Sequence, residues 1–219
     1  MPELDDAEVL EWIGRFIARI HTVGAQSDFV SRPTLNVETF ATASRDWLMA
    51  HHIIPMDQQT EWLATCNQAI EMAQQMFHAY PVRHLRLHGD CHPGNILWTP
   101  TDLPNGGPHF VDLDDARMGP AVQDLWMLLS GDRRQRTQQL SMLLDGYEQM
   151  RDFNRQELAL IEPLRTLRLI HYSAWLARRR DDPAFVQHFS WFGTSDYWAG
   201  QTHMLVEQCE AMQEAPLYA

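Results

Sequence analysis

The sequence predicts a mainly α-helical fold that contains one small β-hairpin region. Before residue 80 and after residue 120, apolar residues recur at spacings of three and four, which is the period of an amphipathic helix. Between residues 85 and 113 they fall into short runs bounded by Gly and Pro, which is typical of strands joined by turns. The chain has no internal repeat, low-complexity tract or linker, so we expect a single domain over residues 1–219.

Three helices are expected in the first part of the chain. The first covers residues 9–23, follows a cluster of acids that suits a helix N-terminus, and ends at Gly24. The second covers residues 37–49, and the third covers residues 58–77 and ends before Pro81.

Three short strands are expected next, at residues 86–87, 96–98 and 109–111. The segment between the last two contains Asn105-Gly106-Gly107, which is a turn signal. We therefore expect those two strands to form a hairpin.

The helical period returns after Gly119-Pro120. Helices are expected over residues 121–129 and 135–150, then up to residue 180, and finally over residues 195–212. Asn154 followed by Glu157 has the spacing of a capping box at the start of the long helix, and Ser195 is the expected cap of the last one.

Composition excludes several classes of function. The 17 basic residues against 29 acidic ones give a formal net charge of −12, which argues against a non-specific binder of nucleic acid or anionic membranes. No apolar run is long enough to span a membrane, and the acidic first ten residues do not resemble a signal peptide. Three cysteines suit reduced thiols, so we expect a cytoplasmic protein.

The residues that carry chemistry lie in His88-Gly89-Asp90-Cys91-His92-Pro93-Gly94-Asn95 and, after the hairpin, at Asp112. Phosphoryl transfer needs a carboxylate that orients the attacking hydroxyl, and an amide oxygen and a second carboxylate that hold Mg²⁺ against the nucleotide phosphates. Mg²⁺ prefers hard oxygen ligands and takes few of them from protein. A tight loop carrying Asp90 and Asn95, with a hairpin that returns Asp112, brings these groups together.

This pattern resembles the aminoglycoside phosphotransferase and choline kinase family, whose fold is like that of protein kinases. The family signature H-G-D-x-x-x-x-N reads HGDCHPGN here, and FVDLDD follows it. The longer strings HGDCHPGNILW and FVDLDDARMGPAVQDLWMLLSGD are similar to a branch of cytoplasmic bacterial Ser/Thr protein kinases that act in stress responses. The resemblance covers most of the chain.

The resemblance implies a role for each matching residue. Asp90 matches the catalytic base, Asn95 the first Mg²⁺ ligand and Asp112 the second, with Asp112 also counted as catalytic. Asp114 or Asp115 is a candidate further metal or water contact, and the sequence does not choose between them.

Two more residues match structural positions of the superfamily. Asp124 matches an aspartate that braces the catalytic loop from a buried helix. His88 is expected to fix the same loop by hydrogen bonding.

The resemblance also implies a part that this chain does not contain. Such kinases have an N-terminal β lobe with a Gly-rich loop and a strand lysine that binds the nucleotide. The residues before His88 are instead expected to be helical, and all 17 basic residues are arginines. We therefore expect residues 1–219 to form the C-terminal helical lobe alone, with its catalytic loop and metal hairpin at residues 85–115, and to have very weak or no kinase activity by itself.

The function implied is ATP- and Mg²⁺-dependent transfer of a phosphoryl group to Ser/Thr hydroxyls of a protein substrate. One alternative is a phosphotransferase that acts on an aminoglycoside, choline or sugar hydroxyl with the same residues. Another is a non-catalytic lobe that binds a partner, such as the missing N-terminal lobe. The sequence does not identify the residues that bind ATP.

Other patterns have simpler interpretations. His88, Asp90, Cys91 and His92, with His84 nearby, resemble zinc ligands, but they are too closely spaced for one strand and loop to present together, and the kinase interpretation already uses Asp90. Cys91 lacks a defined base and oxyanion site, which disfavours it as a nucleophile. The arginines at 133–136 and 178–180 suit solvated helix ends, and the aromatic residues at 191–198 suit core packing, although each could contact a substrate.

Overall fold

The computed structural model describes residues 2–182, 185 and 188–219. The chain forms two compact units: Met1–Thr34, Val82–Ile161 and Pro216–Ala219 make up the first, and Leu35–Pro81 and Glu162–Ala215 make up the second. Within the described residues, no helix combines the length and apolar character that crossing a lipid bilayer requires.

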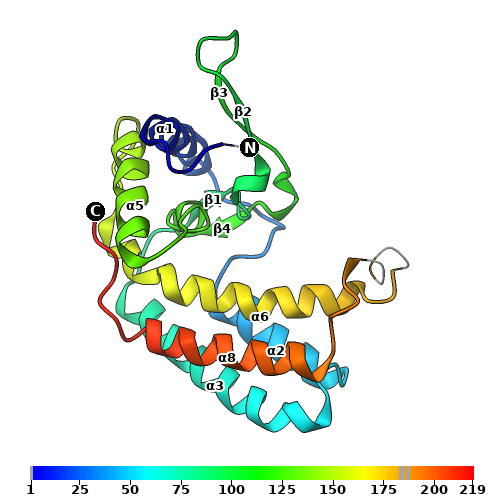
Figure 1. The fold of residues 1–219 in the computed structure, drawn as a ribbon. Helices are drawn as coiled ribbons and strands as arrows, with labels where there is room; N and C mark the ends of the chain where they lie inside the picture. The colour runs from blue at the N-terminus through cyan, green and yellow to red at the C-terminus, as the bar shows by residue number, and fades with distance from the viewer. Residues whose placement is uncertain (1, 183–184, 186–187) are drawn as a thin grey trace. The chain divides into compact units, whose positions relative to one another are not determined.

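The first unit joins helices to two small antiparallel sheets (Figure 1). Its described elements are α1 (Ala7–Gly24), β1 (Leu85–Leu87), β2 (Ile96–Thr99), β3 (Gly107–Phe110), β4 (Arg117–Gly119), α4 (Gln123–Trp126), α5 (Arg133–Tyr147) and the 3₁₀ helices Pro93–Asn95, Leu113–Asp115 and Arg155–Leu160.

Helix α1 packs along α5. Of the apolar face predicted for residues 9–23, the side chains of Val9, Leu10, Ile13 and Ile17 are buried. The side chain of Asp6 caps its first turn by accepting a hydrogen bond from the Glu8 amide at 2.8 Å. The two helices approach closely at Gly14, where a Cβ atom would lie 2.0 Å from the carbonyl oxygen of Leu143. A side chain at this position would therefore push the helices apart.

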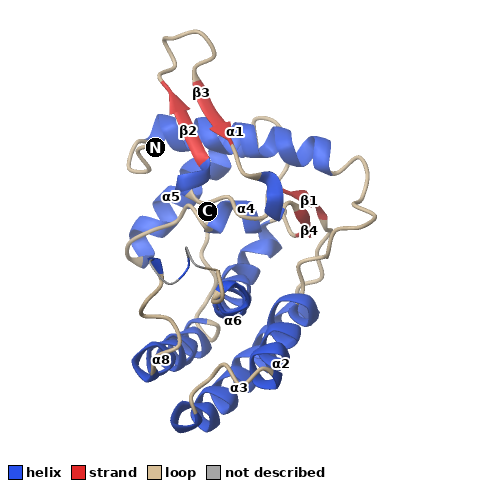
Figure 2. Cartoon of the chain, turned by 90° about the vertical axis from the view of Figure 1, so that its right-hand side faces the viewer, coloured by secondary structure: helices blue, strands red, loops and turns tan. Residues whose placement is uncertain are grey.

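The predicted hairpin is confirmed. Strand β2 pairs with β3 in the register Ile96↔Phe110, and the two strands project from the unit (Figure 2). Strand β4 was not predicted, and it pairs with β1 in the register Leu85↔Gly119. It is three residues long, too short to show an alternating pattern in the sequence.

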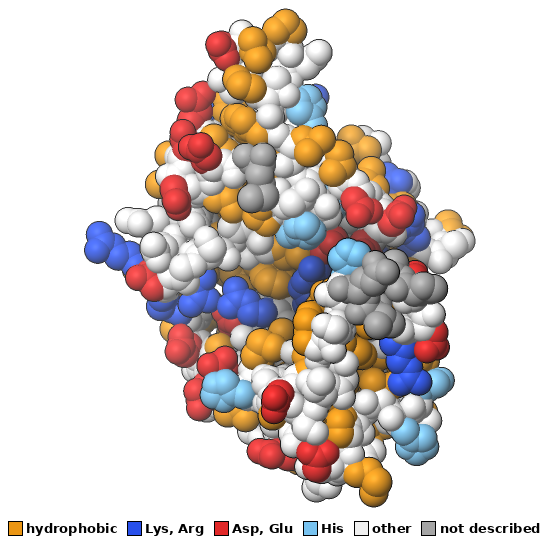
Figure 3. Space-filling model, turned by 45° about the vertical axis from the view of Figure 1, so that its right-hand side comes forward, with side chains coloured by type: hydrophobic (Ala, Val, Ile, Leu, Met, Phe, Trp, Pro, Cys, Tyr) orange, Lys and Arg blue, Asp and Glu red, His pale blue; other side chains and the backbone are white. Residues whose placement is uncertain are grey.

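Hydrophobic side chains remain exposed on the hairpin (Figure 3). Leu97 is 53% exposed and Leu103 is 51% exposed, although large apolar side chains usually lie inside a domain.

Two sequence expectations need correction in this unit. The helix predicted over residues 121–129 is α-helical only over α4, because hydrogen bonds of the i→i+3 type precede and follow it. Asn154 does cap a helix, but that helix is 3₁₀ and lacks the predicted capping box. Glu157 instead turns inward, where its carboxylate accepts a hydrogen bond from the Val122 amide at 2.9 Å.

The second unit is helical. Its described elements are a π-helical turn (Glu38–Thr42), α2 (Ala43–Ala50), α3 (Met56–Ala79), α6 (Ile161–Arg179, whose first residue belongs to the first unit) and α8 (Ser195–Ala211). Helices α3 and α8 pack together, and the rings of Trp62 and Trp198 meet edge to face with centroids 5.5 Å apart. Thr194, rather than the expected Ser195, caps α8.

The aromatic residues near α8 pack on one another. The ring centroids of Phe192 and Tyr197 lie 5.1 Å apart, and Trp198 is fully buried. This packing agrees with the core interpretation for Trp198, whereas Trp191 is 45% exposed.

Candidate active site

The candidate site is built on the 88–95 loop, which connects β1 to β2. Gly89 turns this loop sharply with a φ of 89°, which other residues rarely adopt. A Cβ atom here would lie 2.2 Å from the carbonyl oxygen of Asp115. The loop therefore lies directly against the segment that follows the hairpin, and only glycine allows that approach.

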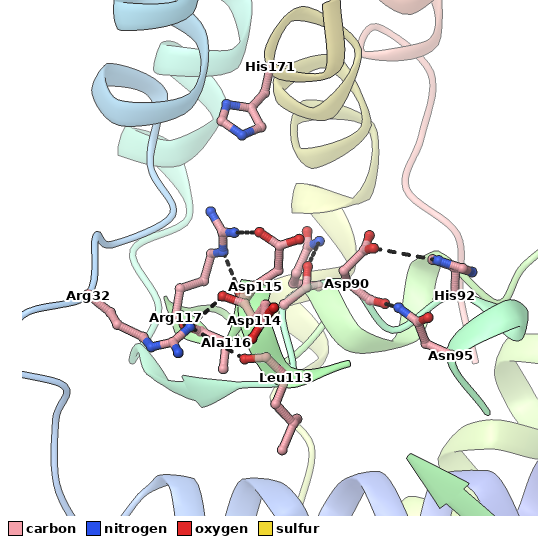
Figure 4. A network of polar contacts seen from close by, with 12 residues as sticks. Arg32, Asp90, His92, Asn95, Leu113, Asp114, Asp115, Ala116, Arg117 and His171 are labelled. Atoms are coloured by element: carbon pink, nitrogen blue, oxygen red, sulfur yellow. Dashed lines mark hydrogen bonds and ion pairs between the residues drawn. The ribbon is translucent and has the colours of Figure 1, made fainter. Parts of the chain in front are cut away.

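Within the loop, backbone and side chain fix the positions of Asp90 and Asn95. The carbonyl of Asp90 accepts hydrogen bonds from the Asn95 side-chain amide at 3.0 Å and from the His92 backbone amide at 2.9 Å (Figure 4). The first bond uses the amide nitrogen of Asn95 and so leaves its amide oxygen for a cation. The carboxylate of Asp90 is 21% exposed, so a substrate hydroxyl can reach it.

His92 faces the carboxylate of Asp90. Its Nδ1 atom accepts a hydrogen bond from the Gly94 amide at 3.0 Å, so the proton of a neutral ring lies on Nε2. Nε2 lies 3.5 Å from Oδ2 of Asp90, a distance within the range of an ion pair. Among the interpretations of the sequence, His92 has a role only in the zinc alternative, and its position two residues after Asp90 was the only signal for this contact.

Asp112 lies at the base of the hairpin beside Asn95. The Val111 amide donates to the carbonyl oxygen of Asn95 at 3.0 Å, which places Asp112 immediately after the residue paired with Asn95. Asp112 itself is left-handed, with φ 61° and ψ 70°. A non-glycine residue in this conformation costs about 1–2 kcal/mol, so other contacts must hold it.

His88 supplies one such contact. Its Nε2 atom lies 2.8 Å from the carbonyl oxygen of Val111, and the side chain is buried. The loop-fixing role expected for His88 therefore has a geometric basis.

The donors at the hairpin base suit Mg²⁺ by type. Asn95 offers a neutral oxygen and Asp112 an anionic one, and Mg²⁺ takes hard oxygen ligands and keeps several waters. Across the part of the chain that the structure describes, no three or more His, Cys, Asp or Glu side chains gather closely enough to hold a metal ion. The zinc alternative therefore loses its support.

The carboxylate of Asp115 is held by a neighbouring arginine. Arg117 pairs with this carboxylate, and its Nε atom donates to the Asp115 carbonyl at 2.6 Å. Asp114 is exposed, and its carbonyl oxygen accepts a hydrogen bond from Arg32 at 2.5 Å. Of the two candidate additional contacts, Asp115 is thus already paired within the chain.

Asp124 braces the 88–95 loop from below, as the sequence predicted. Its Oδ1 atom accepts from the Gly89 amide and its Oδ2 atom from the His88 amide, each at 2.8 Å. The carboxylate is almost completely buried. Charge-assisted hydrogen bonds of this kind are stronger than those between neutral groups, so α4 holds the loop firmly.

Two residues behind Asp124 were missed. Nε2 of His21 lies 3.0 Å from Oδ2 of Asp124, and Nδ1 lies 3.0 Å from the hydroxyl of Tyr147. Burial is the main cause that raises the pKa of Tyr147 above its ordinary value, so its hydroxyl keeps its proton. His21 continues the series Ile13, Ile17 at intervals of four, so a polar residue on an apolar helix face was the available signal.

Cys91 is buried, and burial raises the pKa of its thiol well above the ordinary value, with further contributions from Asp124 and Asp90. A buried thiol that holds its proton is a poor nucleophile. This removes the support for Cys91 as a catalytic group.

Residues 1–161 match the phosphotransferase enzyme family, APH. The chain is 42% identical over 215 residues to stress response kinase A of Escherichia coli K12, and 40% identical to the serine/threonine protein kinase RdoA of Salmonella typhimurium LT2. Each alignment covers 98% of this chain and 63% of the relative, so the chain spans less than two thirds of the length of these proteins.

Solved kinase structures share the fold. Amicoumacin kinase hAmiN, in complex with AMP-PNP, Ca²⁺ and Ami, matches with a TM-score of 0.61 and 19% identity, covering 99% of this chain and 62% of that one. A microcompartment-associated aminopropanol kinase matches with a TM-score of 0.63 and 15% identity, covering 94% and 64%. At these identities the likeness concerns the fold.

Proposed function

Because this chain belongs to the phosphotransferase enzyme family, we propose that it carries the base and metal half of an ATP-dependent phosphotransferase site. Asp90 is the base, and Asn95 and Asp112 are the residues that would hold Mg²⁺. The observation that supports the proposal is the hairpin base, where one loop fixes Asp90 and Asn95 together and the Val111 amide, directly before Asp112, donates to the Asn95 carbonyl.

Each residue has a definable task in the transfer. The carboxylate of Asp90 accepts the proton of the attacking hydroxyl as its oxygen approaches the γ-phosphorus atom. The imidazole of His92, with Nε2 3.5 Å from Oδ2, lies next to that carboxylate. Mg²⁺, when bound, supplies neutralisation of the negative charge on the phosphates. Asp124 binds the backbone of the 88–95 loop, and His88 of that loop contacts the Val111 carbonyl. Together these contacts fix the loop relative to the segment that carries Asp112.

For the substrate, we propose Ser/Thr hydroxyls of a protein. The support is the identity of about 40% to relatives named as stress response kinase and serine/threonine protein kinase. The antibiotic and aminopropanol kinases share the fold at below 20% identity, which favours a small-molecule hydroxyl less strongly. An acidic chain with a net charge of −12 is a poor partner for nucleic acid. We also propose that the protein acts in the cytoplasm, which suits its three cysteines as reduced thiols.

We further propose that residues 1–219 form the helical lobe of this kinase-like fold, and that a separate β lobe supplies the Gly-rich loop and the nucleotide-binding lysine. The support is that the sequence contains no lysine, whereas kinases of this type use a lysine to bind the nucleotide phosphates. The exposed Leu97 and Leu103 of the hairpin provide apolar surface for such a partner lobe.

Phosphoryl transfer from γ-labelled ATP tests both statements. We expect the purified 219-residue chain to transfer label very slowly or not at all. Robust turnover that Asp90→Ala abolishes would contradict the missing-lobe statement. When the chain is joined to the segment that supplies the lysine, label should appear on serine and threonine of a protein such as casein. Transfer to an aminoglycoside alone would contradict the substrate assignment.

A further inference from the structure

The turn that follows Asp112 is held by an arginine from a distant segment. The Nη1 atom of Arg32 donates to the carbonyl oxygens of Asp114 at 2.5 Å and Ala116 at 2.9 Å, and lies 3.4 Å from that of Leu113 (Figure 4). One guanidinium nitrogen therefore contacts three carbonyl oxygens within residues 112–117, which we call the 112–117 turn.

The 112–117 turn needs support from outside. Asp112 enters it in the left-handed conformation, and no side chain caps the 3₁₀ helix that follows. The single turn is closed by a bond from the Ala116 amide to the Leu113 carbonyl at 3.1 Å. One short 3₁₀ turn with poor hydrogen-bond geometry does not compensate for a strained residue at its start.

The segment that carries Arg32 is itself anchored to the first unit. Pro33 restricts the backbone of Arg32 to an extended conformation. Thr34 forms a parallel bridge with Met118, and the Phe29 amide donates to the Met118 sulfur at 3.4 Å. The guanidinium also lies over the Phe29 ring, 5.7 Å from its centroid. The segment that carries Arg32 is thus attached to β4, directly after the 112–117 turn. We call the contact of Arg32 with this turn the clamp.

The choice of partners matters for the metal ligands. Arg32 binds carbonyl oxygens, so it fixes the backbone without pairing with the carboxylate of Asp112. Arg117 holds the same turn from the other direction through the carbonyl and carboxylate of Asp115. In protein kinases, loops in this region are often ordered when arginines pair with an added phosphate group. Here the arginine binds backbone carbonyl oxygens instead of a phosphate group.

We propose that Arg32 is a positioning residue for Asp112: it holds the 112–117 turn in the conformation in which Asp112 follows the residue bonded to Asn95, without any added phosphate. The proposal rests on the proposed function for its link to metal binding. Its structural part, the clamp on the turn, stands independently.

The test uses the 219-residue chain and compares Arg32→Ala, Arg32→Gln and Arg32→Lys with Arg19→Ala. Arg19 is an exposed arginine of α1 that lies over the Phe16 ring. The first readout is hydrogen–deuterium exchange of residues 113–117. We expect faster exchange there in Arg32→Ala and Arg32→Gln, less in Arg32→Lys because an ammonium can still donate to carbonyls, and none in Arg19→Ala. Unchanged exchange in both Arg32→Ala and Arg32→Gln would overturn the clamp.

The second readout is Mn²⁺ affinity in the presence of ATP, followed by electron paramagnetic resonance. Loss of a residue that hydrogen-bonds directly to a ligand weakens metal binding by about 10–100-fold, and because Arg32 acts on Asp112 only through the backbone we expect about the lower figure for Arg32→Ala. Affinity within twofold of the wild type would overturn the positioning role. If the chain joined to its lysine-bearing segment binds no Mn²⁺ through Asp112, the proposed function fails, whereas the exchange result still decides whether Arg32 holds the turn.

Discussion

Nε2 of His21 lies 3.0 Å from Oδ2 of Asp124, and both side chains are almost completely removed from water. Asp124 in turn accepts the backbone amides of His88 and Gly89. Helix α1 is therefore connected to the candidate catalytic loop through one buried carboxylate. The series of hydrogen bonds ends, on the side away from the loop, at the hydroxyl of Tyr147. Such a network rigidifies a site only when every member has a partner.

Removing the Tyr147 hydroxyl is expected to destabilise the protein measurably. In Tyr147→Phe the buried Nδ1 atom of His21 loses its partner, and an unsatisfied buried group costs about 1–3 kcal/mol. Urea unfolding monitored by circular dichroism measures the change. Tyr218→Phe is the matched control, because Tyr218 is 74% exposed, and we expect it to change stability by less than about 0.5 kcal/mol. Equal midpoints for the two variants would show that the network does not stabilise the fold.

Glu157 should make stability depend on pH. Burial raises its pKa to about 7, although the amides of Val122 and Ala121 oppose the shift. The folded protein therefore holds this proton more tightly than the unfolded chain. The stability that results is fully present below pH 4.5, decreases as the pH rises towards 7, and is lost above that. At about 1.4 kcal/mol per unit, the effect is about 3 kcal/mol.

Glu157→Gln removes this titration. Its unfolding free energy relative to that of the wild type should rise between pH 4.5 and pH 8, whereas exposed Glu61→Gln should show no such trend. A constant difference between Glu157→Gln and the wild type across this range would contradict the assignment.

Gly89→Ala is expected to disrupt the 88–95 loop. The added methyl group would meet the Asp115 carbonyl at 2.2 Å, and the φ of 89° is itself unfavourable for alanine by about 1–2 kcal/mol. Thermal unfolding should show a clear loss of stability. Gly200→Ala provides the control, because a Cβ atom there meets nothing within 4 Å and lies in a helix, where alanine is favoured by up to about 1 kcal/mol. Similar behaviour of the two variants would rule out the close approach.

Asp90→Asn tests the role of the base independently of metal binding. In the chain joined to its lysine-bearing segment, we expect phosphoryl transfer to fall by about 10²–10⁴-fold, the usual contribution of a general base. Single-turnover transfer of labelled phosphate measures this loss, and Mn²⁺ affinity should stay near that of the wild type. Asp102→Asn, on the exposed hairpin loop, should change neither quantity. Wild-type transfer rates in Asp90→Asn would exclude Asp90 as the base.

Local signals were enough to predict much of the fold. The apolar period located α1 and α3, and Asn105-Gly106-Gly107 located the hairpin. Elements shaped by distant contacts were described less well. Strand β4 forms because β1 pairs with it, and α4 is short because bonds of the 3₁₀ type surround it. The spacing of Asn154 and Glu157 suggested a local cap, but the Glu157 carboxylate binds the Val122 amide instead.

The candidate site divides in the same way. Asp90, Asn95 and Asp112 follow a short, specific pattern in the sequence, and hydrogen bonds join Asn95 to Asp90 and to Val111, the residue before Asp112; their roles stay a prediction. Arg32 and His21 lie far from the motif along the chain, and each acts through a partner that no spacing rule relates to it. Contacts between such distant residues depend on the packing of the whole unit, which a single sequence does not display.

The most direct test of the account is a Mn²⁺ titration of the 219-residue chain in the presence of ATP, read by electron paramagnetic resonance. We predict that Asp112→Asn weakens Mn²⁺ binding by at least about 10-fold, because a divalent cation loses an anionic ligand, and that Asp102→Asn leaves it unchanged. If Asp112→Asn and Asp102→Asn bind Mn²⁺ as the wild type does, the hairpin base is not a metal site and the central claim is wrong.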